Sequence, residues 1–175
     1  PDVSAKLPGR GCWVKADRKT IEAAVKQKFL LLAGHQLLEN ININVEELEV
    51  DKKDKLVVKV KDDLVDQIGD LLHKRAMDYV GLANRAGNLI AGFEKARAAL
   101  KVGKARILLT ANDAADNGRT KICQGLDNLR VIDIFTRKEL SKVTGLPNAV
   151  HIAILQGGIS TSLIREISRY ERCKK

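Results

Sequence analysis

The residues best suited to hold a charged ligand lie between Tyr79 and Asp113. Gly87 and Gly92 stand at the first sharp turn of this stretch, whose pattern predicts helix, short strand, helix, strand. A strand that leads through Gly92 into a helix leaves the first N–H groups of that helix without intrahelical partners. Such an end attracts phosphate through its donors and its dipole. The cations around this turn are Arg85, Lys95, Arg97, Lys101 and Lys104. The stretch therefore predicts an RNA-binding surface.

The positive charge of the chain is distributed unevenly. The 175 residues carry a net charge of +9. Residues 1–36 hold seven basic against three acidic residues, residues 37–66 hold five against nine, and residues 67–175 hold nineteen against ten. A basic surplus confined to one segment favours a polyanionic partner. Aromatic residues make up only 3% of the chain, too few for a sheet that stacks single-stranded bases, so we expect RNA to be read through backbone and shape.

Other chemistries find little support in the sequence. Cys12, Cys123 and Cys173 form no C-x-x-C pair, so neither a zinc site nor a disulfide framework is predicted, and Cys173 is expected to be exposed near the basic tail. No Ser/His/Asp order and no G-x-x-x-x-G-K loop appears, so we expect no enzyme activity, cofactor or metal. His151 falls in a predicted strand, as a core or edge residue. No apolar run reaches the roughly 18 residues of a membrane span, and we expect a cytoplasmic protein.

The elements that position the basic turn alternate between strand and helix. One helix is predicted from about Asp63 to just before Gly87. Further strands are predicted at 106–110, 130–135 and 149–155, with helices near 120–124, after Thr136, and from Ser160 to about Arg172. Thr136 and Glu139 have the spacing of a capping box. This alternation predicts an α/β fold in which helices cover both faces of a sheet.

The amino-terminal third is predicted to be organised differently. Residues 1–36 are expected to form a small α+β segment, with a short strand at Cys12–Val14 and a helix capped by Asp17 that runs to about Ala33. Residues 37–66 are expected to form an acidic linker or hairpin whose charge would avoid RNA. Residues 67–175 are expected to form the RNA-binding domain.

Five motifs, in order and with matching spacing, are similar to those of a known family. They are GLANRAG at 81–87, AGFEK at 91–95, GKARILLTANDA at 103–114, TRKEL at 136–140 and AVHIAIL at 149–155. Through them, residues from about 70 to 165 resemble the small ribosomal proteins that bind kink-turn RNA, in their bacterial YlxQ-like branch. The resemblance implies a three-layer α/β/α sandwich and non-catalytic binding of structured RNA, ribosomal or other, in association with the ribosome or translation.

The resemblance also implies three places of RNA contact. They are the first strand-to-helix turn with Gly92, Phe93, Glu94 and Lys95, the preceding helix end with Asn84 and Arg85, and the loop with Val143, Thr144 and Gly145. High-affinity kink-turn binders carry an Asn-Glu pair where this chain has Glu94 and Lys95. Glu94 either accepts a hydrogen bond from a guanine amino group or complements the helix N-terminus. Lys95 and Arg97 either contact phosphate or belong to a solvated helix face.

A second resemblance concerns the amino-terminal segment. Lys6-Leu7-Pro8-Gly9-Arg10-Gly11, followed by Cys12-Trp13-Val14, resembles the back half of YlxR, another small bacterial nucleic-acid-binding family. The front half of that family would precede Pro1, so residues are expected to be missing there. Arg10 either contacts phosphate or forms a local hydrogen bond in its Pro/Gly turn.

Two further functions stay open beside RNA binding. The same fold would serve as a protein-interaction module that holds a basic partner through residues 37–66 or the loop at Gly145. It would also serve as an accessory domain that delivers RNA to a modifying enzyme. The sequence leaves the oligomeric state and the identity of the RNA open.

Overall fold

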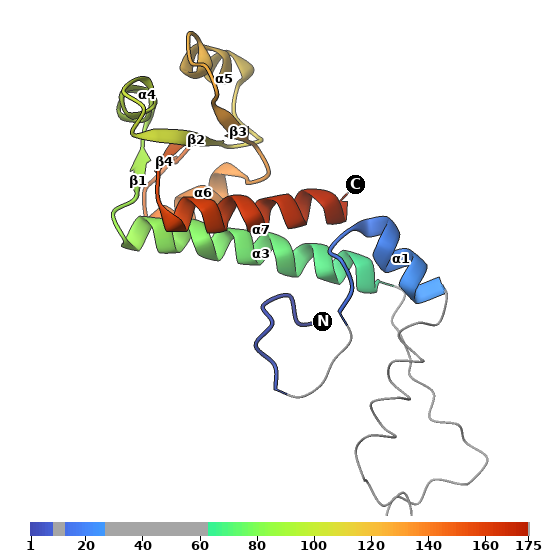
Figure 1. Ribbon diagram of the computed structural model, residues 1–175. Helices are drawn as coiled ribbons and strands as arrows, with labels where there is room; N and C mark the ends of the chain where they lie inside the picture. Colours follow the sequence, from blue (N-terminus) through green and yellow to red (C-terminus); the bar gives the residue numbers. More distant parts are fainter. Residues whose placement is uncertain (9–12, 27–62, 175) are drawn as a thin grey trace, which may run out of the picture. The chain divides into compact units, whose positions relative to one another are not determined.

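The computed structural model describes residues 1–8, 13–26 and 63–174 (Figure 1). The chain divides into two compact units, one made of residues 1–72 and 168–175 and the other of residues 73–167. The long helices α3 (Leu64–Arg85) and α7 (Gly158–Lys174) contribute residues to both units. The predicted boundary between residues 36 and 37 and most of the predicted acidic segment lie outside the described residues.

A four-stranded mixed sheet forms the centre of the larger unit. Its strands are β1 (Leu89–Ala91), β2 (Ala105–Thr110), β3 (Arg130–Ile132) and β4 (His151–Leu155). They lie in the order β1-β4-β2-β3, in which β4 pairs antiparallel with β1 and β2, and β2 pairs parallel with β3. The two central strands, β2 and β4, are almost entirely buried, as expected of strands covered on both faces.

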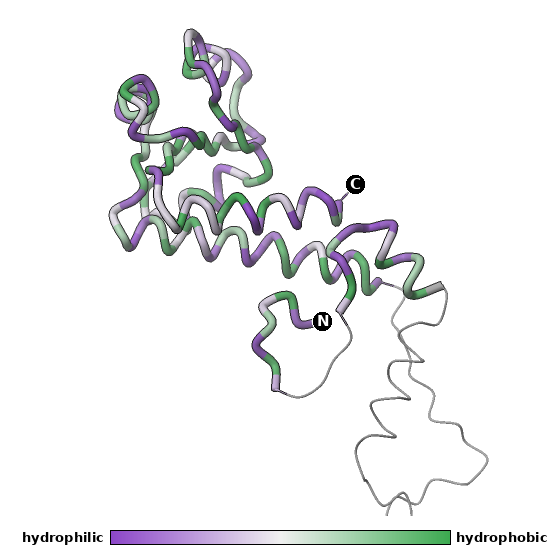
Figure 2. The backbone as a smooth tube through the Cα atoms, in the orientation of Figure 1, coloured by the Kyte–Doolittle hydropathy of each residue, from purple (hydrophilic) through white to green (hydrophobic). Residues whose placement is uncertain are grey.

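Helices cover both faces of this sheet. The shorter ones are α4 (Phe93–Lys101), α5 (Asp116–Cys123) and α6 (Arg137–Thr144). On one face, α6 and parts of α3 and α7 pack against Leu109 and Ile154, and on the other face α4 and α5 pack against Leu108 and Ala153. Figure 2 shows apolar positions recurring among polar ones along α3 and α7, the pattern of helices that bury one side. The predicted α/β fold in three layers is thereby confirmed.

Some element boundaries differ from the prediction. Helix α5 begins at Asp116 rather than near Thr120, and α7 begins at Gly158 rather than after Ser160. Ser160 lies inside the first turn of α7, where its hydroxyl donates to the Gly157 carbonyl at 2.7 Å. Strand β3 ends at Ile132, and the chain then turns so that Phe135 enters the core with none of its surface exposed.

Helix α6 begins with the predicted capping box. The hydroxyl of Thr136 accepts from the Glu139 N–H at 3.2 Å, and the Glu139 carboxylate accepts from the Thr136 N–H at 2.7 Å. The carboxylate of Asp113 accepts a further bond from the Arg137 N–H at 2.8 Å. Side chains therefore accept from two of the first three N–H groups of this helix, those of Arg137 and Glu139. Its other end closes at Gly145, which adopts the left-handed conformation with φ 71°.

Replacing Thr136 by alanine is expected to lower the free energy of unfolding by about 1 kcal/mol. The Glu139 N–H loses its acceptor, and the Glu139 carboxylate loses the hydroxyl that donates to it at 2.8 Å. Urea denaturation measures the change. A Thr136→Ser variant keeps the hydroxyl and should stay close to the original stability, so a serine variant as unstable as the alanine variant would contradict this role.

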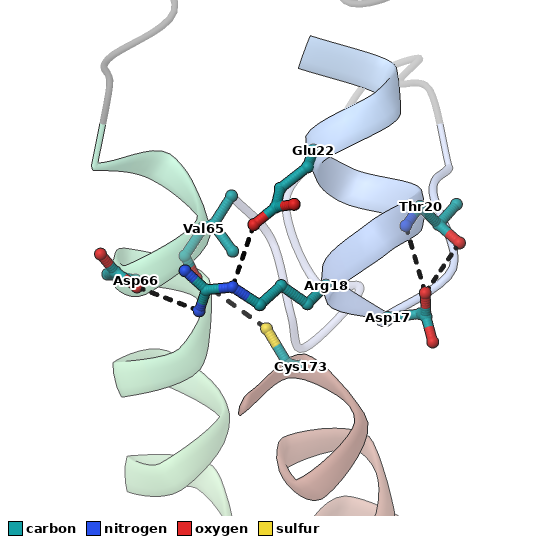
Figure 3. A network of polar contacts seen from close by, with 7 residues as sticks. All are labelled: Asp17, Arg18, Thr20, Glu22, Val65, Asp66 and Cys173. Atoms are coloured by element: carbon teal, nitrogen blue, oxygen red, sulfur yellow. Dashed lines mark hydrogen bonds and ion pairs between the residues drawn. The ribbon is translucent and has the colours of Figure 1, made fainter. Parts of the chain in front are cut away.

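The smaller unit is held together around α1 (Arg18–Lys26). Asp17 caps this helix as predicted, because its carboxylate accepts from the Thr20 N–H at 3.1 Å (Figure 3). Ile21, Leu72 and Cys173 form the buried cluster of the unit. The prediction that Cys173 is exposed is wrong. Only 1% of its surface is accessible, because it lies on the inner side of α7, where its thiol points to the Val65 carbonyl 3.9 Å away.

Candidate nucleic-acid interface

Gly92 forms the predicted turn between β1 and α4. Its dihedral angles, φ 99° and ψ 146°, fall in a region that side-chain-bearing residues rarely adopt. The Gly92 N–H donates to the His151 carbonyl at 3.0 Å, and the Gly92 carbonyl accepts from the Ala96 N–H at 2.9 Å. These two bonds fix the turn to β4 on one side and to the helix on the other. A side chain at Gly92 would meet nothing within 4 Å, so the turn faces open space.

The N-terminus of α4 presents its donors to solvent. The N–H groups of Phe93, Glu94 and Lys95 precede the first intrahelical bond, and in the part of the chain that the structure describes no side chain caps them. Gly92, Glu94 and Lys95 are all exposed. Helix α6 differs, since protein side chains accept from two of its first donors, the Arg137 and Glu139 N–H groups. Of these two helix starts, α4 is therefore the one that can bind an external anion.

His151 is a buried residue next to the Gly92 turn. Only 7% of its surface is exposed, and its Nδ1 lies 2.9 Å from the Thr110 hydroxyl. The ring of Phe93 meets the His151 ring edge-on, with centroids 5.7 Å apart, and a Cβ added at Gly118 would lie 3.1 Å from His151 Nε2. His151 thus fills the space between β4, α4 and α5, which confirms its prediction as a core or edge residue. The Phe93 side chain packs inward and leaves its backbone N–H at the turn.

The protein is expected to lose stability as the pH falls below 6.5, the ordinary pKa of histidine. Burial lowers the pKa of His151 below its ordinary value of 6.5. Below that ordinary value the unfolded chain binds a proton that the folded protein does not bind, so stability is full above pH 6.5 and declines below it. Urea denaturation at a series of pH values measures this slope. A His151→Gln variant cannot be protonated and should show a flatter slope in this window, whereas an unchanged slope would contradict the assignment.

Asn84 connects two of the predicted contact regions. Its side-chain amide donates to the Thr144 carbonyl at 3.2 Å and to the Val143 carbonyl at 3.4 Å, which joins the end of α3 to the end of α6. One turn earlier, a Cβ at Gly81 would lie 3.1 Å from the Val143 side chain, so the glycine allows the two helices to approach closely. The sequence did not single out Gly81 for this role, because its reason for being a glycine is the neighbouring helix. Arg85 is exposed at the end of α3.

The loop after α6 is fixed by a buried hydrogen bond and by apolar packing. The Thr144 hydroxyl is buried and donates to the Leu140 carbonyl at 2.8 Å, and Val143 packs against the core. The Thr144 side chain is therefore part of the protein interior, and the Val143 side chain is half-buried. Gly145 and Leu146, which follow them, are exposed. This loop leads directly to His151, whose carbonyl holds the Gly92 turn, so both regions lie around the start of β4.

The predicted cations differ in what they contact. Arg85, Lys95, Lys101 and Lys104 are exposed, and none of them forms an ion pair within residues 1–8, 13–26 and 63–174. The Arg97 guanidinium, in contrast, donates to the Lys121 carbonyl and, at 3.2 Å, to the Gln124 carbonyl. Arg97 thus satisfies carbonyls at the end of α5 and would have to leave them to contact phosphate. Arg10 lies outside the described residues.

The described residues give less support to a metal site or a membrane-spanning helix. Among the described residues, no group of three His, Cys, Asp or Glu side chains is arranged to hold a metal ion, and no helix has the length and apolar character to cross a membrane. A hollow of about 310 Å³ lies at the far end of α4, lined in part by Lys101, Arg106 and Asn128.

Comparison with known proteins gives one strong sequence match. No protein-family model matches the chain. The RNA-binding protein YlxQ of Enterococcus faecium is 35% identical over 79 residues, which are 44% of this chain and 77% of that protein. Solved structures with a similar fold include a protein of unknown function from Bacillus halodurans, at 24% identity and a TM-score of 0.48, covering 53% of this chain and 96% of that one. Another is the 15.5kD RNA binding protein of Giardia lamblia, at 13% identity and a TM-score of 0.48, covering 71% of this chain and 99% of that one. Because the match to the Enterococcus protein is 35% identical and covers 77% of that protein, this chain belongs to the YlxQ family.

Proposed function

We propose that this chain is a non-catalytic RNA-binding protein that binds structured RNA through the N-terminus of α4. The observation that carries the proposal is the open start of this helix, where three N–H donors and the exposed Lys95 face solvent. Helix α5 also starts without a side-chain cap, whereas at α6 side chains accept from the Arg137 and Glu139 N–H groups. Membership of the YlxQ family, whose Enterococcus member is named an RNA-binding protein, supports the same function.

The residues around the Gly92 turn would have different roles in RNA recognition. Lys95, Arg85 and the N–H groups of Phe93, Glu94 and Lys95 would contact phosphate, which positions the RNA. Glu94 and backbone groups near Gly145 would reach base edges, which gives sequence preference. Asn84 would act indirectly, because it fixes the loop at Gly145 relative to α3. We propose that the ligand is ribosomal RNA or another structured RNA in the cytoplasm. We also propose that the protein is associated with translation.

A salt titration tests this function. Binding of a fluorescently labelled, folded RNA hairpin with an internal bulge is measured by fluorescence anisotropy at salt concentrations from about 50 to about 200 mM. Each phosphate contact contributes roughly −0.7 to −0.9 to the slope of log affinity against log salt. We expect a slope of about −2 or steeper, from Lys95, Arg85 and the helix end together. A flat dependence, or no binding at low salt, would remove the proposal.

A protein-interaction module is the second candidate function. Leu82 and Leu146 are 40% and 45% exposed, near the ends of α3 and α6, and exposed apolar side chains favour protein contacts. Under this alternative, partner proteins would stay bound after nuclease treatment. Under the proposed function, nuclease treatment releases them.

A further inference from the structure

The hollow at the end of α4 opposite the Gly92 turn has a volume of about 310 Å³. On its apolar side are Leu100, which is buried, and Leu126 and Leu129, which are half-buried. The charged residues of the same lining are Lys101, Arg106 and Asp127. Small-molecule sites have volumes of roughly 300 to 1,000 Å³, so this hollow is at the lower end of the range. It therefore combines an apolar surface with both signs of charge, at a size that fits one small ligand.

The two cations of the hollow are not engaged by the helix ends beside it. The Leu100 carbonyl accepts from the Gly103 N–H at 3.1 Å, and Arg97 donates to carbonyls at the end of α5. These carbonyls therefore have donors other than Lys101 and Arg106. Both cations are exposed, and within the part of the chain that the structure describes neither forms an ion pair. Lys101 and Arg106 are thus available to an external anion.

Asp127 gives the hollow a hydrogen-bond acceptor that is separate from its cations. The residue is exposed, and it forms no ion pair with Lys101 or Arg106. An ionised carboxylate only accepts hydrogen bonds. A ligand that matches the hollow must therefore bring donors to Asp127 and negative charge to the two cations. Between these two groups it needs an apolar surface that covers the leucines.

We propose that this hollow binds a single guanine nucleotide, either free or at an unpaired position of an RNA. The face of the base would cover Leu126 and Leu129, and the phosphate would contact Lys101 and Arg106. Guanine carries two adjacent donors, N1–H and the N2 amino group, and one carboxylate accepts from both. Uracil has a single N–H between two carbonyl oxygens, which would repel the Asp127 carboxylate. The hollow should therefore prefer guanine.

The proposed nucleotide site is distinct from the Gly92 turn. Helix α4 has nine residues, so its two ends are about 13 Å apart at 1.5 Å per residue. None of the residues that would contact RNA at the Gly92 turn lines the hollow. The inference therefore does not rest on the proposed function, although an RNA bound at the turn would have one of its nucleotides within reach of the hollow.

Amide chemical shifts of the full chain, titrated with guanosine monophosphate, test this proposal. Signals of Gly103 and of residues 125–129 should shift in a saturable manner, with a Kd of about 1 mM or tighter. Uridine monophosphate should bind about 10-fold more weakly, because it cannot replace the hydrogen bonds to a charged acceptor. Asp127→Asn should remove most of this preference, since an amide has one acceptor oxygen in place of two.

Charge reversal in the hollow provides a second test. Lys101→Glu should weaken binding of guanosine monophosphate about 10-fold or more, because it removes a phosphate contact and adds a like charge. Lys104→Glu is the matched control. Lys104 is also exposed and lies three residues further along the chain, but it does not line the hollow, so its replacement should leave the affinity unchanged.

The outcomes separate this site from the function proposed at α4. Shifts that do not saturate, equal affinity for the two nucleotides, or equal loss in the two lysine variants would each overturn the nucleotide site. If guanosine monophosphate binds together with a saturating amount of the folded hairpin, the ligand is a free nucleotide, whereas displacement by the hairpin identifies a nucleotide of the RNA. Salt-dependent binding of the hairpin without any nucleotide binding leaves the function at α4 standing alone. Nucleotide binding without hairpin binding leaves only the hollow.

Discussion

Replacing Lys95 by glutamate is expected to weaken binding of the folded hairpin roughly 10- to 100-fold. A hydrogen bond to a charged group contributes about 1.5–3 kcal/mol, which corresponds to this range of affinity. Lys95 lies in the first turn of α4, exposed and beside the uncapped N–H groups, so the substitution removes a cation and places a carboxylate where phosphate would bind. Anisotropy titration at fixed salt measures the loss, and the slope of affinity against salt should become shallower by about 1.

Lys138→Glu provides the matched control for this substitution. Lys138 is also exposed and also lies in the first turn of a helix, but that helix is α6, in which side chains accept from the neighbouring Arg137 and Glu139 N–H groups. The two variants change the net charge of the protein equally. If both weaken binding to the same extent, the effect is one of overall charge and the site is not at α4. If Lys95→Glu alone binds as well as the original protein, the site lies elsewhere.

Replacing Arg75 by methionine is expected to destabilise the larger unit by about 3 kcal/mol. Glu166 in α7 is 1% exposed, and its carboxylate lies 3.0 Å from the Arg75 guanidinium on α3. Removal of Arg75 takes away the more buried of two arginines beside this carboxylate, since Arg165, 3.3 Å away, is 63% exposed. A buried charge that loses its main partner retains its desolvation cost without the compensating attraction. Urea denaturation measures the change in unfolding free energy.

Arg165→Met is the control for this pair. Because Arg165 is largely in solvent, its ion pair with Glu166 should contribute less than about 1 kcal/mol. A loss of stability in Arg165→Met as large as in Arg75→Met would show that the exposed arginine carries the interaction. A stable Arg75→Met variant would show that Arg75 is not the group that compensates the buried Glu166 carboxylate.

Much of the fold follows from local sequence. The helix that ends before Gly87, the strand at 106–110 and the capping box at Thr136 were predictable, because hydrophobic period and capping residues act over a few positions. Burial of Cys173 and Glu166 was not predictable in this way. Both lie in a stretch of mixed charge, and what buries them is a facing helix far away in sequence. The exposure of Trp13 likewise depends on which of its neighbours reach the core.

The candidate site was predictable in outline but not in detail. Gly92 and the cations near it are visible in the sequence, and the structure places the turn at an uncapped helix start. The sequence did not predict the internal hydrogen bonds of Asn84 and Arg97. Their acceptors are backbone carbonyls of elements about 60 and 25 residues away, and a local sequence pattern does not indicate which distant elements the fold brings together. The resemblance of residues 1–36 to YlxR, and the predicted domain boundaries, stay predictions.

Amide chemical shifts of the isotopically labelled protein test the central claim most directly. On titration with the folded hairpin, the N–H signals of Phe93, Glu94 and Lys95 should shift most, because these groups would bind phosphate. The signals of Arg137 and Glu139, at the occupied start of α6, should move little. Large shifts at α6 with none at α4, or shifts confined to residues away from both, would contradict RNA binding at the N-terminus of α4.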